Sequence, residues 1–83
     1  MKALYFAWVR ERIGKAEEEI ALPENIKTVA ELMAWLSSQG ENYAAAFAHI
    51  KTLRAALDRT HVKHDALIQN AREIAFFPPM TGG

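Results

Sequence analysis

The segment that begins at Thr28 constrains the fold most, because it predicts one long helix with a single apolar face. Thr28 and Glu31 have the spacing of a capping box, in which the threonine covers a free N–H at the helix start and the glutamate reaches back to the cap. Apolar residues then recur at helical spacing: Val29, Leu32, Met33 and Leu36. Gly40 is the expected C-terminal stop. A helix of this kind needs a sheet on which to bury its apolar face.

Short apolar runs before this helix predict two strands. Residues 2–9 are rich in aromatic and aliphatic side chains, and residues 17–22 alternate before Pro23 stops the run. Between them, residues 10–14 predict a charged turn or a single helical turn that ends on glycine. The three glutamates at 17–19 discourage pairing along a sheet edge. Together these segments predict an opening hairpin with a wide loop.

The second half of the chain predicts a shorter helix and three further strands. Residues 42–50 carry apolar side chains among alanines and favour the helix. The expected strands are residues 53–57, 60–63 and 73–77. The last strand ends where Pro78 and Pro79 remove two donors from the hydrogen-bond ladder. One main helix between an opening hairpin and later strands predicts a two-layer α+β domain.

The first and last strands are apolar on both faces, although one helix layer covers only one face of a sheet. If the smaller side chains of the first strand pack under the helix, Phe6, Trp8 and Phe77 are left on the open face. An apolar patch of this kind usually marks a surface for a partner protein. The alternative is that loops or the second helix cover these residues.

Composition excludes several classes of function. The 83 residues suffice for one small domain, whose modest core leaves no room for a deep enclosed pocket. Ten basic and ten acidic side chains cancel, so we expect neither nucleic acid nor a membrane surface as a partner. The sequence contains no cysteine, which removes disulfides, thiolate ligands and a cysteine nucleophile. The first apolar run is too short for a signal peptide or a membrane span, which predicts a cytoplasmic protein.

His61, His64 and Asp65 are the one cluster in the sequence that resembles a metal site. A zinc site needs three or four convergent ligands, whereas these residues offer two imidazoles and one adjacent carboxylate. We therefore expect solvated histidines and no bound metal. The four glycines form no phosphate-binding loop, so the chain is not expected to bind ATP or another cofactor by itself.

The sequence ends on FFPPMTGG, whose composition predicts a projecting tail. Pro78 and Pro79 each fix φ and disfavour helix, so the exit from the last strand is stiff and extended. The residues from Pro78 onward span at most about 20 Å, enough to enter another protein's active site. Gly82 and Gly83 lack a Cβ and can thread a narrow channel. The Gly83 carboxylate is ionised at neutral pH and can attack the α-phosphate of ATP to give an acyl-adenylate.

Four stretches, in chain order, resemble the small subunits of molybdopterin synthase: LYFAWVRERIG, TVAELMAWL, AALDRTHV and AFFPPMTGG. The resemblance implies a ubiquitin-like β-grasp fold, in which a mixed sheet packs on one main helix and a flexible C-terminal Gly-Gly tail follows. The domain would cover residues 1–78 and the tail residues 79–83. The resemblance also implies a sulfur carrier for molybdenum cofactor biosynthesis, a non-catalytic subunit with no cofactor of its own.

In that family an activating enzyme uses ATP to adenylate the terminal glycine, here Gly83, and a sulfur donor converts it to a thiocarboxylate. The large synthase subunit then receives the tail, with Thr81 and Gly82 in the threading segment. Side chains of the large subunit pass the sulfur to a cyclic pterin precursor. The residues that would contact the partner proteins are Phe6, His61, Phe77, Pro78 and Pro79.

Three positions depart from the family pattern. His61 stands where relatives often have an aliphatic residue, which makes that contact more polar. Asp58 replaces a common asparagine, and residues 71–73 read Ala-Arg-Glu where relatives commonly have Gly-Asp-Glu. Asn70 tolerates a left-handed conformation and is expected to form the tight turn in place of glycine.

Three other functions share parts of this pattern. The related sulfur carrier for thiamine thiazole has the same fold and Gly-Gly end, but it usually lacks the FFPP approach. A ubiquitin-like protein modifier would use Gly83 to form isopeptide bonds with lysines. A passive adaptor would use only the apolar patch, and deletion of Gly83 would then be harmless.

Overall fold

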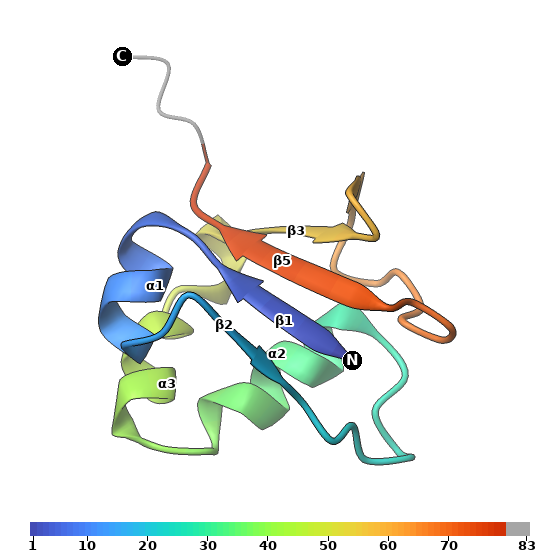
Figure 1. The fold of residues 1–83 in the computed structure, drawn as a ribbon, viewed down its shortest axis with the longest axis horizontal. Helices are drawn as coiled ribbons and strands as arrows, with labels where there is room; N and C mark the ends of the chain where they lie inside the picture. Colours follow the sequence, from blue (N-terminus) through green and yellow to red (C-terminus); the bar gives the residue numbers. More distant parts are fainter. Residues whose placement is uncertain (80–83) are drawn as a thin grey trace.

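The computed structural model describes residues 1–79, which form a mixed sheet with helices packed against it (Figure 1). In chain order the elements are β1 (Lys2–Tyr5), α1 (Ala7–Ile13), β2 (Glu17–Glu19), α2 (Val29–Ser37), α3 (Glu41–Ala46), the 3-10 helix η1 (Ile50–Thr52), β3 (Arg54–Leu57), β4 (Thr60–Val62) and β5 (Glu73–Phe77). The strand order is β2-β1-β5-β3-β4. The central pair β1 and β5 runs parallel, whereas the other neighbouring pairs are antiparallel.

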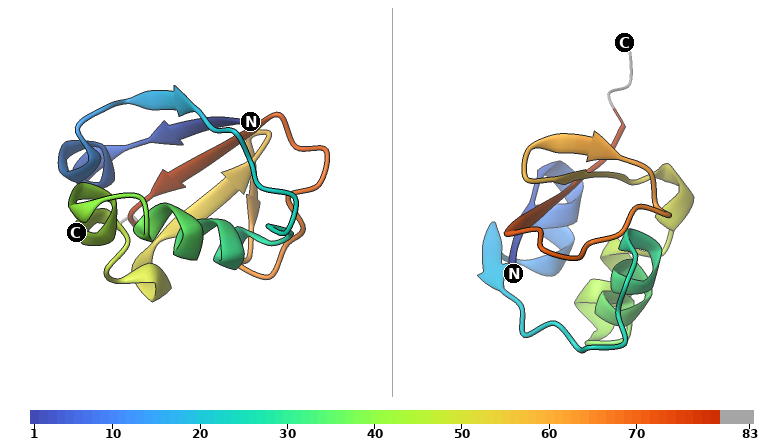
Figure 2. Two further views of the ribbon diagram at one scale, coloured as in Figure 1. Left: turned by 90° about the horizontal axis from the view of Figure 1, so that it is seen from below. Right: turned by 90° about the vertical axis from the view of Figure 1, so that its right-hand side faces the viewer.

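The helices α2 and α3 lie on one face of this sheet, and α1 lies at its end beside the tips of β1 and β5 (Figures 1 and 2). The opposite face carries no helix within residues 1–79. The first and last strands are central neighbours, so the tail leaves from the middle of the sheet and not from an edge. This is the two-layer α+β arrangement that the residue patterns predicted, and it is the ubiquitin-like β-grasp fold that the resemblance implied.

The core lies between the helix-facing side of the sheet and α2. Alternate strand residues are fully buried there: Ala3, Tyr5, Ile74 and Phe76. The apolar face of α2 meets them through the four residues predicted for it, which are all buried. Phe76 is at the centre of the core. The Phe47 ring meets the Phe76 ring edge-on, with 5.1 Å between the ring centroids, and the Tyr5 ring is stacked on it, with 6.3 Å between the centroids. Replacing a buried phenylalanine with alanine typically costs about 3–5 kcal/mol, so Phe76 is a principal determinant of stability.

The predicted capping box at the start of α2 is confirmed. The Glu31 N–H donates to Thr28 Oγ1 at 3.2 Å, and Glu31 Oε1 accepts from the backbone N–H groups of Lys27 and Thr28 at 2.9 and 3.0 Å. These two backbone donors, Lys27 first, lower the pKa of Glu31 because they stabilise its ionised form. The cap therefore depends on a charged glutamate.

The prediction that Gly40 ends this helix is wrong. The helix ends at Ser37, with Ser38 as a right-handed C-cap, and Gly40 is instead the residue that precedes α3. The last turn needs no glycine because Ser38 Oγ and Gln39 Nε2 both donate to the Trp35 carbonyl, at 2.6 and 3.2 Å. Local side chains thus take the role that glycine backbone geometry usually provides.

The N-terminal hairpin is confirmed, but its elements differ from the prediction. The first strand ends at Tyr5, and Trp8 and Val9 belong to the seven-residue helix α1. Ala7 adopts a left-handed φ of 53°, which turns the chain out of the sheet. The helix ends at Ile13, and the C-cap Gly14, with its φ of 92° and its N–H bond to the Arg10 carbonyl, closes the last turn. The spacing of the buried residues Val9 and Ile13, at i and i+4, is the sequence signal for this helix.

Most of the remaining elements are shorter than predicted. The strand β2 is only Glu17–Glu19, an edge strand as its charges suggested. The helix predicted at residues 42–50 is α3, which ends at Ala46. The predicted strands at 53–57 and 60–63 are β3 and β4, and β5 has the predicted bounds. No helix among residues 1–79 is long and apolar enough to cross a membrane.

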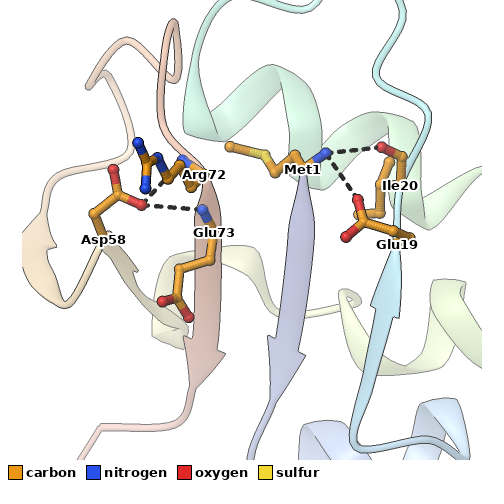
Figure 3. Close-up of polar contacts among 6 residues, drawn as sticks. All are labelled: Met1, Glu19, Ile20, Asp58, Arg72 and Glu73. Atoms are coloured by element: carbon orange, nitrogen blue, oxygen red, sulfur yellow. Dashed lines mark hydrogen bonds and ion pairs between the residues drawn. The ribbon is translucent and has the colours of Figure 1, made fainter.

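The turn before β5 is held by Asp58, one of the three positions at which the sequence departs from the family pattern (Figure 3). Its Oδ1 accepts from the backbone N–H groups of Arg72 and Glu73, each at 3.0 Å. Asp58 itself has a left-handed φ of 45°, and Asn70 has a φ of 69°, as expected for the residue that replaces glycine. The β3–β4 turn is therefore tied to the start of the strand that carries the tail.

Candidate functional site

The candidate site begins where β5 ends and the tail starts. Phe77 is the last residue of β5, and the half-buried Pro78 and Pro79 follow it out of the sheet. Neither ring nitrogen carries a hydrogen, so the ladder ends here. The predicted threading residues Thr81 and Gly82 and the predicted reactive Gly83 lie outside the described residues.

The structure brings Phe77 and His61 together on the open face. Phe77 points away from the core because it alternates with the fully buried Phe76. The ring centroids of His61 and Phe77 are 5.1 Å apart and the rings are tilted by 54°. His61 comes from β4, two strands away from β5, so this contact depends on β3 lying between them. Two residues predicted from the resemblance thus form one local cluster.

Phe6 lies beside the same end of β5. Its backbone N–H donates to the Phe76 carbonyl at 3.1 Å, and its φ and ψ of −124° and 153° continue the extended backbone of β1. The side chain is 48% exposed, an unusual degree for a phenylalanine. Phe6 and Phe77 are therefore apolar side chains at the root of the tail, as the sequence predicted.

Trp8 does not lie on the open sheet face, contrary to the prediction. It belongs to α1 and is partly buried against the core. The Arg12 guanidinium lies 4.4 Å from the centroid of the Trp8 ring, a cation–π arrangement one helical turn away. The error follows from the strand prediction for residues 2–9, which assigned faces by alternation beyond the point where the chain becomes helical.

Small and apolar residues complete the open face between these aromatic groups. The strand register places Leu4 opposite Ala75, Ala75 opposite Ala56, and Ala56 opposite His61 on neighbouring strands. We call the six residues on this side the open-face patch: Leu4, Phe6, Ala56, His61, Ala75 and Phe77. The alanines at its centre have small side chains, whereas the aromatic side chains around them extend further from the sheet. The patch therefore forms an uneven apolar surface against which another protein can pack.

The acidic strand β2 contains a partly buried hydrogen-bond centre that sequence reasoning missed. Glu18 Oε2 accepts from the hydroxyls of Tyr5 at 2.7 Å and Tyr43 at 2.6 Å, and Lys15 Nζ lies 3.3 Å from Glu18 Oε1. Burial alone would raise the pKa of Glu18, but these donors outweigh it and lower the pKa. Burial and the bond to Glu18 raise the pKa of Tyr5. This network joins β1, β2 and α3 on the helix side, away from the open-face patch.

The two histidines of the cluster that resembles a metal site have separate contacts. The His61 ring lies tilted against the Phe77 ring, and His64 Nε2 lies 2.8 Å from the Leu53 carbonyl oxygen. Within residues 1–79, no group of three or more histidine, aspartate and glutamate side chains is placed to hold a metal ion.

Two open hollows lie elsewhere on the surface. One, of about 380 Å³, lies between β2 and α2 and includes Glu18, Trp35 and Tyr43 in its lining. The other, of about 340 Å³, lies between Leu22 and Leu67 at the end of the sheet where β1 and β5 begin. Neither is lined by residues at the root of the tail, so within residues 1–79 the candidate site is the exposed surface around the end of β5.

Proteins of similar sequence share the whole length of this chain. It is 39% identical over 83 residues to the molybdopterin synthase sulfur carrier subunit of Escherichia coli K12, covering 100% of this chain and 99% of that protein. The subunit of the same name from Haemophilus influenzae is 35% identical with the same coverage.

Solved structures of similar fold support the same grouping. A candidate molybdopterin converting factor, subunit 1, from Pyrococcus furiosus superposes with a TM-score of 0.73 at 25% identity, covering 94% of each chain. SAMP1 of Haloferax volcanii superposes with a TM-score of 0.72 at 17% identity, covering 100% of this chain and 98% of its own, which is a likeness of fold alone. The sequence profile of the ThiS family matches residues 3–83, which include the tail. The chain therefore belongs to the ThiS family.

Proposed function

We propose that this chain is the sulfur carrier subunit of a molybdopterin synthase and acts in molybdenum cofactor biosynthesis. The observation that carries the proposal is full-length similarity, at 39% and 35% identity, to two proteins of that name. The fold is consistent with this role, because a central strand delivers the tail directly beside an exposed apolar patch. A partner can bind the patch and receive the tail at the same time.

The chemistry would take place at Gly83, the last residue of the sequence. In an activating enzyme, its carboxylate oxygen attacks the α-phosphorus of ATP, forming an acyl-adenylate and releasing pyrophosphate. Sulfide delivered by a sulfur donor then attacks the acyl carbon, AMP leaves, and a thiocarboxylate remains. In the synthase the sulfur passes to the pterin precursor and water restores the carboxylate. The catalytic side chains belong to the large subunit, so this chain is a donor and not itself a catalyst.

Residues 1–78 would serve as the docking domain and residues 79–83 as the transfer tail. The contact residues are Phe6, His61, Phe77, Pro78 and Pro79. The two prolines hold the exit extended, and Thr81 and Gly82 supply length without bulk, so that a tail of at most about 20 Å reaches a recessed site. The same surface would serve the large subunit and the activating enzyme in turn, in the cytoplasm.

Reconstitution with purified partners tests this proposal. The chain would be incubated with the activating enzyme, ATP, a sulfur donor, the large subunit and the pterin precursor, and dithiolene product would be measured. We expect product with the full chain and none after deletion of Gly83. A matched control replaces Ala48, an exposed residue far from the tail in sequence, with glycine and should retain activity. Equal product from the Gly83 deletion would contradict the proposal.

A further inference from the structure

In this neutral chain, some of the charged side chains that the structure describes form ion pairs with one another and others do not, and the two kinds lie in different places. The ion pairs among residues 1–79 involve the acids of β2 and β5: Met1 amino group with Glu19 at 3.1 Å, Lys2 with Glu17 at 2.9 Å, Lys15 with Glu18 at 3.3 Å, and Arg59 with Glu73 at 4.0 Å. Figure 3 shows the first of these at the end of the sheet where β1 begins, far along the strand from the tail. The acids of the sheet are therefore matched by cations of the same chain.

Three cations near the tail root have no such partner among the described residues: Arg10, Arg54 and Lys63. We call them the basic collar. Arg54 is the register partner of Phe77, so its exposed side chain lies on the open face directly beside the last residue of β5. Arg10 lies on α1, one turn beyond Phe6, and α1 packs beside the same end of β5 (Figure 1).

Lys63 completes the collar on the β4 side. It directly follows β4, and its neighbour His64 contacts the Leu53 carbonyl at 2.8 Å, which brings this segment beside the start of β3. The acids nearest in sequence are Glu11 on α1 and Asp65, both exposed and in no ion pair within residues 1–79. Arg54 and Lys63 thus lie at the end of the sheet where β5 ends, and Arg10 lies on the helix that packs beside the same end.

We propose that the basic collar binds carboxylate side chains of the large synthase subunit, arranged around the opening through which that subunit admits the tail. This inference rests on the proposed function and names the surface chemistry of the partner. Unpaired surface charges next to an apolar contact accelerate association and fix orientation when the partner surface has the opposite sign. A nucleic acid is a poor fit, because three cations around an apolar patch do not follow a phosphate backbone. The collar would align the tail with its channel before the apolar contacts form.

Association kinetics with the purified large subunit test this inference. The collar variant carries Arg54→Gln and Lys63→Gln, whereas the matched control carries Lys27→Gln and Arg72→Gln and loses the same charge at exposed positions away from the tail root. At low ionic strength we expect the collar variant to associate about fivefold more slowly and the control to stay within about twofold of wild type. The difference should shrink at high salt, because the Debye length falls to about 3 Å at 1 M.

The outcomes separate the two proposals. Equal slowing of both variants would mean that net charge, and not the position of the collar, sets the association rate. Faster association of the collar variant would mean that the partner surface is basic. Either result would overturn the proposal that the collar binds carboxylates. Failure of the wild-type chain to associate with the large subunit at all would overturn the proposed function and the collar together. A slower collar variant that nevertheless accepts sulfur normally supports both.

Discussion

The ring of His61 lies 5.1 Å from the ring of Phe77, and this contact joins β4 to the strand that carries the tail. The pair places an exposed polar ring against a half-buried apolar one, within the open-face patch that we assign to partner binding. The contact explains how a histidine can occupy a position where an aliphatic residue would be expected, because its ring packs against the Phe77 ring at an angle of 54°.

Replacing Phe77 with alanine is expected to weaken binding of the large subunit by about 2 kcal/mol, or roughly 30-fold in Kd, since buried aromatic residues at interface centres dominate affinity. Leu67→Ala is the control, because Leu67 is a 65% exposed apolar residue away from the patch. Calorimetric titration of both variants measures the effect. Similar affinities for the two variants would remove Phe77 from the interface.

His61→Leu is expected to retain binding of the large subunit, because leucine restores an apolar contact on Phe77. His61→Asp should weaken binding by more than tenfold, since it places an unpaired charge in a contact that becomes buried on association. The same titration compares the two variants. If His61→Leu bound as weakly as His61→Asp, the imidazole would be making a specific polar contact that the apolar description of the patch omits.

Asp58→Ala is expected to reduce the free energy of unfolding by about 1–3 kcal/mol, because two backbone N–H groups lose their acceptor and the left-handed φ of 45° disfavours alanine. Asp58→Asn keeps an acceptor oxygen and tolerates this conformation, so it should stay within about 0.5 kcal/mol of wild type. Urea unfolding measures both. A loss for asparagine equal to that for alanine would show that the carboxylate charge, and not its hydrogen bonds, holds the turn.

Glu18 predicts a specific pH dependence of stability. Its folded-state pKa is lower than the ordinary glutamate value of 4.5, so its ionised form contributes stability that is present above pH 4.5 and is lost as pH falls through the lowered pKa. The difference in unfolding free energy between wild type and Glu18→Gln should therefore be constant from about pH 5.5 to 7. It should shrink below about pH 4.5. Urea unfolding across this range provides the measurement. A difference that grows toward acid would contradict the assigned hydrogen bonds.

Sequence reasoning succeeded where local signals and core burial agree. The capping box at Thr28 and the alternation of β5 each depend on residues close in sequence, and both were found in the structure. The helix α1 was missed because the aromatic run that includes Phe6 and Trp8 favours a strand on composition, whereas the helix buries Val9 and Ile13 in the core.

The candidate site was predictable in part for the same reason. Phe6 and Phe77 were predicted from strand alternation and again from the resemblance, whereas His61 came from the resemblance alone. The structure places Phe6 and Phe77 at one end of β5 and His61 against Phe77. The hydrogen-bond centre at Glu18 was not predictable, since three adjacent glutamates look alike until Tyr5 and Tyr43 meet the middle one from β1 and α3. The basic collar likewise depends on cross-strand register, which the sequence alone does not specify.

The central claim, that sulfur is carried on Gly83, is tested most directly by the intact mass of the protein purified from its native cells. Replacement of one carboxylate oxygen by sulfur adds about 16 Da, and the account predicts this increase on the C-terminal peptide alone. The increase should be absent from a chain that lacks Gly83. Detection of only the unmodified carboxylate, even after incubation with activating enzyme, ATP and sulfur donor, would contradict the account.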